Sequence, residues 1–156
     1  MKRIEGTANG SGLRVCVIDT GWNEMIVSQL TKGALATLMK HGVADDDITH
    51  VTVPGAFEIP VAAQTAASTG RYDAVVTLGC VIRGDTAHFD FVAGEAAKGI
   101  SKVALDSGVP VVFGILTTDT VEQAMDRAGI KLGNKGSEAA SVAVETARIL
   151  QALKEG

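Results

Sequence analysis

Short apolar stretches alternate with amphipathic segments along this chain, and this alternation limits the folds that the chain can adopt. Short apolar stretches predict strands, of which the first is a buried one, and each is followed by a segment that predicts a helix. The predicted strands are residues 13–19, 48–53, 74–79 and 109–116, and the predicted helices are residues 23–41, 58–69, 88–107, 120–127 and 137–154. Strands that alternate with helices form a parallel sheet covered by those helices. The sequence therefore predicts an α/β fold with a four-stranded parallel sheet and helices on both faces.

The length of 156 residues suits one domain, because a chain of this size can bury one sizeable core. We expect that domain to span residues 13–156. A four-stranded parallel sheet in such a domain is typical of the flavodoxin-like three-layer sandwich. Residues 1–12 are polar and predict an N-terminal arm. The arm is either a disordered tail or a strand that joins a neighbouring subunit, with Ile4 as its anchor.

Composition and charge exclude several classes of protein. The formal net charge is −4 and no cluster of Lys and Arg stands out, so we expect no nucleic-acid partner. No apolar run is long enough to cross a bilayer, and residues 1–6 lack the apolar core of a secretion signal, so we expect no membrane partner. Cys16 and Cys80 form neither a CxxC pair nor a metal-ligand spacing. We therefore expect a cytoplasmic protein without a metal site.

Polar residues follow each predicted strand, at the positions where a parallel sheet binds its ligands. The carboxyl ends of parallel strands meet at one edge, and a crevice at that edge is the usual binding site of an open α/β sheet. The segments concerned are residues 19–23, 54–58, 83–88 and 117–120. We therefore expect one binding crevice there. The sequence has no GxGxxG or GxxxxGK[ST] fingerprint, which disfavours a dinucleotide or P-loop site.

Residues 78–90 carry the strongest chemical signal in the chain. An apolar strand ends there in a turn that contains Gly84 and Thr86, and a helix begins at His88. The free N–H groups at the start of a helix bind anions such as phosphate. A histidine titrates near neutral pH and can move protons. The segment predicts a phosphate site beside a proton-transfer group; the alternative is an exposed histidine without a role.

Other polar and aromatic candidates have two interpretations each. Trp22 either stacks on a planar ring or wedges the first helix onto the sheet. Glu58 either accepts hydrogen bonds from a polyol or stabilises the start of a helix. Arg83 either contributes to the anion site or pairs with Asp85 or Asp90. Position in the sequence does not separate these alternatives.

Four motifs occur in order along the chain. They are Val-Pro-Gly-Ala-Phe-Glu-Ile-Pro at residues 53–60, the run at residues 78–90, Gly-Ile-Leu-Thr-Thr at residues 114–118, and Arg-Ala-Gly with Gly-Asn-Lys-Gly at residues 127–129 and 133–136. Together they resemble the lumazine synthase family of riboflavin biosynthesis. The resemblance implies the flavodoxin-like fold and the condensation of 5-amino-6-(ribitylamino)uracil with 3,4-dihydroxy-2-butanone 4-phosphate. The product is 6,7-dimethyl-8-ribityllumazine, phosphate and water are released, and neither a cofactor nor a metal is implied.

The resemblance also implies roles for individual residues. His88 is the residue expected to transfer protons, and Trp22 is expected to stack on the pyrimidine. The remaining substrate-binding residues implied are Ala56, Phe57 and Glu58 for the pyrimidine and its ribityl chain, Cys80, Val81 and Ile82 for the ring pocket, Asp85 and Thr86 for the phosphate substrate, and Phe113, Arg127 and Lys135 from the adjacent subunit. On this interpretation the site is completed only at a subunit interface.

The resemblance implies at least a homopentamer. The link at residues 129–136 has the short form that favours a 60-subunit icosahedral shell. Leu132, however, stands in this link where a small residue is frequent, so the pentamer and the shell both stay open. Association with riboflavin synthase stays open as well. A different class of function is a lumazine- or flavin-carrying or shell protein with little catalysis. The presence of both His88 and Arg127 favours the enzyme, because a carrier needs neither a proton shuttle nor a phosphate clamp.

Overall fold

A four-stranded, all-parallel sheet forms the middle of the molecule, as the computed structural model shows for residues 1–156. The strand order is β2-β1-β3-β4, so β2 and β4 are the edges. The strands are β1 (Val15–Thr20), β2 (Ile48–Val53), β3 (Ala74–Ile82) and β4 (Val111–Thr118). The helices are α1 (Glu24–Lys40), α2 (Ile59–Ser68), α3 (His88–Ser107), α4 (Val121–Arg127) and α5 (Lys135–Glu155), with short 3₁₀ turns η1 (Asp45–Asp47) and η2 (Ala56–Glu58). The predicted α/β fold is confirmed.

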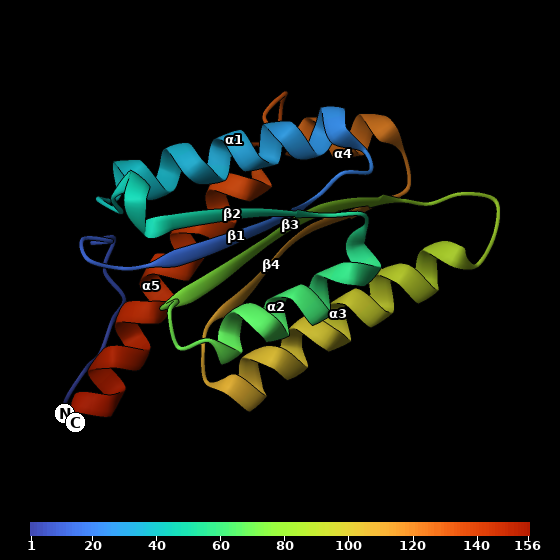
Figure 1. Ribbon diagram of the computed structural model, residues 1–156. Coiled ribbons are helices and arrows are strands. Elements are labelled where there is room, and N and C mark those ends of the chain that lie inside the picture. Colours follow the sequence, from blue (N-terminus) through green and yellow to red (C-terminus); the bar gives the residue numbers. More distant parts are fainter.

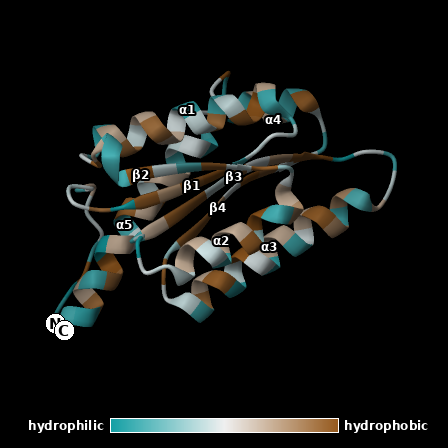
Figure 2. Cartoon of the chain, viewed as in Figure 1, coloured by the Kyte–Doolittle hydropathy of each residue, from teal (hydrophilic) through white to brown (hydrophobic).

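Helices cover both faces of the sheet, which gives three layers (Figure 1). Helices α1, α4 and α5 pack on one face, and α2 and α3 pack on the other. Side chains alternate between the two faces along a strand. In β1, Val15 and Val17 point into the first core, whereas Cys16 and Ile18 point into the second. Figure 2 shows largely apolar strands between helices in which hydrophobic and hydrophilic residues alternate.

Close contact between helices α1 and α5 depends on a glycine. A side chain at Gly136 would overlap the backbone of Leu30 in α1. Asn134 caps the start of α5, because its Oδ1 accepts a hydrogen bond from the N–H of Ser137 at 3.1 Å. The cap places the first turn of α5 at Lys135, two residues earlier than the sequence predicts.

Strands β3 and β4 are longer at their carboxyl ends than the sequence predicts. The sequence predicts ends at residues 79 and 116, but the two strands pair in parallel register as far as Ile82 and Thr118. Their mutual pairing continues β3 past Gly79 through three more apolar residues and carries β4 into two threonines. Residues 80–82 are therefore part of a strand, not of the turn.

Residues 1–12 form neither helix nor strand, and they run back along α5 so that the two chain ends lie side by side (Figure 1). The guanidinium of Arg148 holds this segment by donating to the carbonyls of Asn9 and Ser11, both at 2.7 Å. A role for the arm in a neighbouring subunit stays a prediction. None of the helices has the length and apolar character needed to span a membrane.

Candidate active site

A pocket of about 460 Å³ opens at the carboxyl edge of the sheet, where the sequence predicts the binding crevice. The loops after β1, β2 and β3 surround it, on the right-hand side of Figure 1. Most of the site residues implied by the resemblance meet there. Those that line the pocket are Trp22, Ala56, Phe57, Glu58, Cys80, Val81, Ile82 and His88.

The loop after β1 places Trp22 over the loop after β2. The backbone N–H of Trp22 donates to the carbonyl of Pro54 at 3.1 Å, and the indole packs against Gly55. A Cβ at Gly55 would lie 2.5 Å from Cε3 of the indole, so only glycine leaves room for the ring. Trp22 is still 66% exposed. The ring thus rests on the loop after β2 and leaves most of its surface free, and stacking on a planar ring stays a prediction.

Glu58 lies at the end of η2 and faces the same loop. Its Oε2 accepts a hydrogen bond from the backbone N–H of Gly55 at 3.2 Å. The carboxylate therefore stabilises the start of a helix, as the simpler interpretation predicts. It also lines the pocket, where its other acceptor positions are available to a ligand.

His88 is the first residue of α3, and its side chain lines the pocket. Its backbone N–H donates weakly to Thr86 Oγ1 at 3.4 Å. Asp85 and Thr86 belong to the exposed loop before α3 and are not among the residues that line the pocket. The structure thus brings the proposed proton-transfer residue to the pocket and leaves the proposed phosphate loop at its margin.

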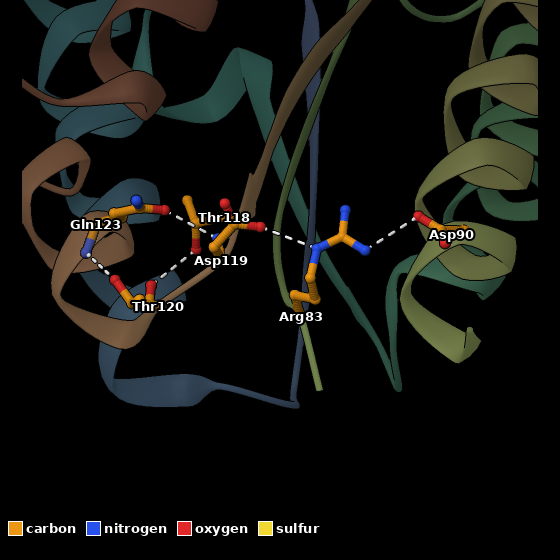
Figure 3. A network of polar contacts seen from close by, with 6 residues as sticks. All are labelled: Arg83, Asp90, Thr118, Asp119, Thr120 and Gln123. Carbon is orange, nitrogen blue, oxygen red and sulfur yellow. Dashed lines mark hydrogen bonds and ion pairs between the residues drawn. The ribbon is translucent and has the colours of Figure 1, made fainter. Parts of the chain in front are cut away.

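Arg83 connects the loop after β3 to the loop after β4 (Figure 3). Its Nε donates to Asp119 Oδ1 at 2.9 Å, and its Nη1 lies 3.5 Å from Asp90 Oδ1. The guanidinium also stacks over Phe89, 4.3 Å from the ring centroid. The hydrogen bond to Asp119, with Asp90 adding to it, raises the pKa of Arg83 above its usual value. Of the two expected partners Asp90 is found, whereas Asp85 makes no ion pair.

Cys80 lines the pocket, but its thiol does not have the environment of a nucleophile. Cys80 is buried, and burial raises the pKa of its thiol to about 11. A reactive cysteine instead has a lowered pKa and a cationic neighbour. Cys80 therefore contributes as a small apolar residue and through its carbonyl, which accepts a hydrogen bond from Asn23 Nδ2 at 2.8 Å.

Phe113, Arg127 and Lys135 lie together in a separate pocket of about 520 Å³ beside β4 and the start of α5. None of them lines the first pocket. Arg127 sits at the end of α4, where its Nη1 donates to the carbonyl of Gln123 at 3.1 Å. Apart from Asp85 and Thr86, which line neither pocket, a single chain thus carries the implied site residues as two separate groups.

Five further residues line the pocket. Thr20, Asn23 and Gly55 belong to the segments expected at the crevice, whereas sequence reasoning did not identify Phe91 and Val92. Phe91 lies three residues after His88, so the two share one face of α3, and this spacing could have identified it. Asn23 adopts a left-handed backbone conformation with φ of 58°, which turns the chain from Trp22 into α1. That conformation depends on the fold and has no clear signal in the sequence. No group of three or more His, Cys, Asp or Glu side chains forms a metal-binding cluster.

Comparison with known proteins decides the family. The model of the 6,7-dimethyl-8-ribityllumazine synthase family matches residues 12–151. The chain belongs to this family. A 6,7-dimethyl-8-ribityllumazine synthase of Nitratidesulfovibrio vulgaris (strain DSM 19637 / Miyazaki F) is 53% identical over 153 residues, with 98% of each chain covered. The enzyme of the same name from Deinococcus radiodurans is 52% identical over 154 residues, with 99% of each chain covered. The resemblance to lumazine synthases is therefore confirmed over almost the whole chain.

Proposed function

We propose that the pocket at the carboxyl edge of the sheet is the active site of a 6,7-dimethyl-8-ribityllumazine synthase. The protein is an enzyme of riboflavin biosynthesis that condenses 5-amino-6-(ribitylamino)uracil with 3,4-dihydroxy-2-butanone 4-phosphate. The amine and the ketone form a Schiff base with loss of water, phosphate is then eliminated, and ring closure releases a second water. The observation that carries the site assignment is the convergence of Trp22, Glu58 and His88 on one pocket.

Each part of the pocket matches one part of the pyrimidine substrate. The free face of Trp22 offers a stacking surface for the planar ring. The carboxylate of Glu58 accepts hydrogen bonds from the ribityl hydroxyls, and Ala56 and Phe57 hold the ring and its chain. Residues 80–82 form the floor, largely through backbone groups, because they belong to a strand.

Proton transfer is the role of His88. Schiff-base formation, elimination and ring closure each move protons, and an imidazole can both accept and donate them near neutral pH. The phosphate substrate binds beside it, at Asp85 and Thr86. The Asp85 carboxylate repels a phosphate, so its backbone N–H is the group that serves. Most of the rate enhancement comes from holding the two substrates together.

A homopentamer completes the site. Phe113, Arg127 and Lys135 lie on a different surface from the pocket, so a neighbouring subunit must present them to it. Arg127 then contacts the phosphate of the second substrate. Assembly of pentamers into a 60-subunit icosahedral shell and association with riboflavin synthase are further parts of this proposal. We also expect a cytoplasmic enzyme, because both cysteines are free, as is usual in a reducing compartment.

A steady-state assay with both substrates, monitored by lumazine absorbance and fluorescence, tests the proposal. His88→Ala should lower kcat, whereas Arg127→Ala should raise KM for the phosphate substrate. Size-exclusion chromatography with light scattering should show that both variants assemble like the wild type. Ligand binding without turnover in the wild type would favour the carrier instead. An unchanged KM for the phosphate substrate in Arg127→Ala would exclude the cross-subunit site.

A further inference from the structure

A buried polar cluster lies beside the pocket without lining it. Its centre is the carboxylate of Asp19, one residue before the end of β1, and Asp19 is only 6% exposed. Thr31 Oγ1 donates to Asp19 Oδ2 at 2.8 Å, and Thr52 Oγ1 donates to Oδ1 at 2.6 Å. His50 Nε2 lies 2.7 Å from Oδ2. The side chain of Asp19 thereby joins β1 to both α1 and β2.

The cluster adds side-chain bonds to an edge strand that pairs with only one neighbour, β1. A buried carboxylate must be surrounded by donors, because an unpaired one loses several kcal/mol of hydration. All three partners of Asp19 are side chains from other elements, so their bonds constrain those elements relative to β1. Strand β2 is mostly exposed along its length. Polar contacts to Asp19 therefore add to the ladder with β1 and the half-buried Val53 in positioning its carboxyl end.

The hydrogen bonds of Asp19 lie directly before the loops after β1 and β2 that line the pocket. Asp19 and Thr52 face each other in the β1–β2 ladder, one pair before its end. Immediately beyond, the N–H groups of Gly21 and Trp22 donate to the carbonyls of residues 53 and 54 at 2.8 and 3.1 Å. These bonds set the indole against Gly55. A shift of β2 relative to β1 would move the indole with it.

We propose that Asp19 is a positioning residue for pyrimidine binding. Its carboxylate holds the carboxyl ends of β1 and β2 in register against α1, and this register places the free face of Trp22 where the substrate ring stacks. Asp19 touches neither substrate. The inference rests on the proposed function for the identity of the ligand, but the placement of Trp22 can be measured without turnover.

The test compares Asp19→Ala with Asp73→Ala, a matched carboxylate. Asp73 Oδ2 accepts from the N–H of Arg14 at 2.8 Å, before the start of β1 and away from the pocket. We expect Asp19→Ala to raise KM for the pyrimidine about fivefold with kcat within about twofold, because a small displacement weakens stacking. In the wild type and both variants, Trp22 is the sole tryptophan. The amplitude of the fast component of its fluorescence anisotropy decay reports local motion of the indole. This amplitude should rise about twofold in Asp19→Ala and stay unchanged in Asp73→Ala.

A second pair of variants covers the case in which Asp19→Ala does not fold. Thr52→Val replaces the hydroxyl by a methyl group at nearly constant shape, whereas Thr52→Ser keeps the hydroxyl. We expect the first to change pyrimidine KM and Trp22 mobility in the same direction as Asp19→Ala, and the second to match the wild type. Equal behaviour of Asp19→Ala and Asp73→Ala, with lower thermal stability but unchanged KM and anisotropy, would overturn the inference. An inactive wild type would overturn the proposed function instead, and the anisotropy would still decide the role of Asp19.

Discussion

Gly55→Ala is the most direct probe of the stacking surface. Gly55 has an extended backbone, with φ of −145° and ψ of 179°, so alanine fits there without backbone strain. The new Cβ, however, would lie 2.5 Å from Cε3 and 2.7 Å from Cζ3 of Trp22. Ordinary contacts begin near 3.4 Å, so the indole must move by about 0.9 Å. The substitution therefore displaces Trp22 and leaves its chemistry unchanged.

The expected effect is on substrate binding more than on stability. Stacking on an aromatic side chain contributes about 1–3 kcal/mol, and a displacement of this size loses part of it, so we expect pyrimidine KM to rise roughly tenfold. Because Trp22 is largely exposed and can move outward, the loss of unfolding free energy should be about 1 kcal/mol or less. The KM for the phosphate substrate should stay within about twofold, because its proposed site is elsewhere.

Steady-state kinetics with each substrate varied, together with thermal melts, measure these effects. Gly94→Ala is the control, since a Cβ at Gly94 in α3 meets no atom within 4 Å. Trp22→Ala should raise pyrimidine KM at least as much as Gly55→Ala. The double variant Trp22→Ala/Gly55→Ala should show no further increase, because the clash with the indole is gone and Glu58 Oε2, 3.3 Å from the new Cβ, needs to move by only about 0.1 Å. An unchanged KM in Gly55→Ala, or additive losses in the double variant, would refute the stacking argument.

Further predictions concern Cys80, alkaline pH and the Arg83 network. Cys80→Ser should keep kcat within about twofold, because a thiol with a pKa of about 11 is neutral at pH 8; a large loss in the assay would indicate a catalytic thiolate. Burial raises the pKa of both Cys16 and Cys80 from 9.0 to about 11, so the thiols of the unfolded chain lose their protons at lower pH than those of the folded chain. The free energy of unfolding, measured by denaturant melts, should therefore fall as the pH rises from 9 to 11. In a double-mutant cycle, Arg83→Gln and Asp119→Asn should show weak coupling that disappears at high salt, because both side chains are exposed; strong coupling at 1 M salt would contradict this.

Local signals in the sequence identified most elements of the fold. Thr120 caps α4 by accepting from the N–H of Gln123 at 3.1 Å, and Gly108 ends α3 in a left-handed conformation, both as their residue types predict. Apolar periodicity located every strand. It missed the ends of β3 and β4, where pairing between the two strands continues to Ile82 and Thr118, past Gly79 in β3 and into Thr117 and Thr118 in β4.

For the candidate site, too, the sequence predicts one part and the structure supplies the other. The position of His88 after an apolar strand, and of Trp22 and Glu58 after two others, predicts one crevice, because carboxyl ends of parallel strands must share an edge. The partners of these side chains required the structure. The pairing of Arg83 with Asp119 depends on β3 and β4 being neighbours, which only the strand order decides.

The sequence by itself determined the fold class, the family and the edge of the sheet that binds ligand, because these follow from local periodicity, turn residues and ordered motifs. Only the tertiary structure decided the strand order, the separation of the implied site into two groups and the buried setting of Asp19. His50 shows the reason. Within β2 it has no informative neighbour in sequence, yet parallel pairing brings it against a carboxylate 31 residues away. Hydrogen bonds between distant segments depend on packing geometry, which local sequence does not contain.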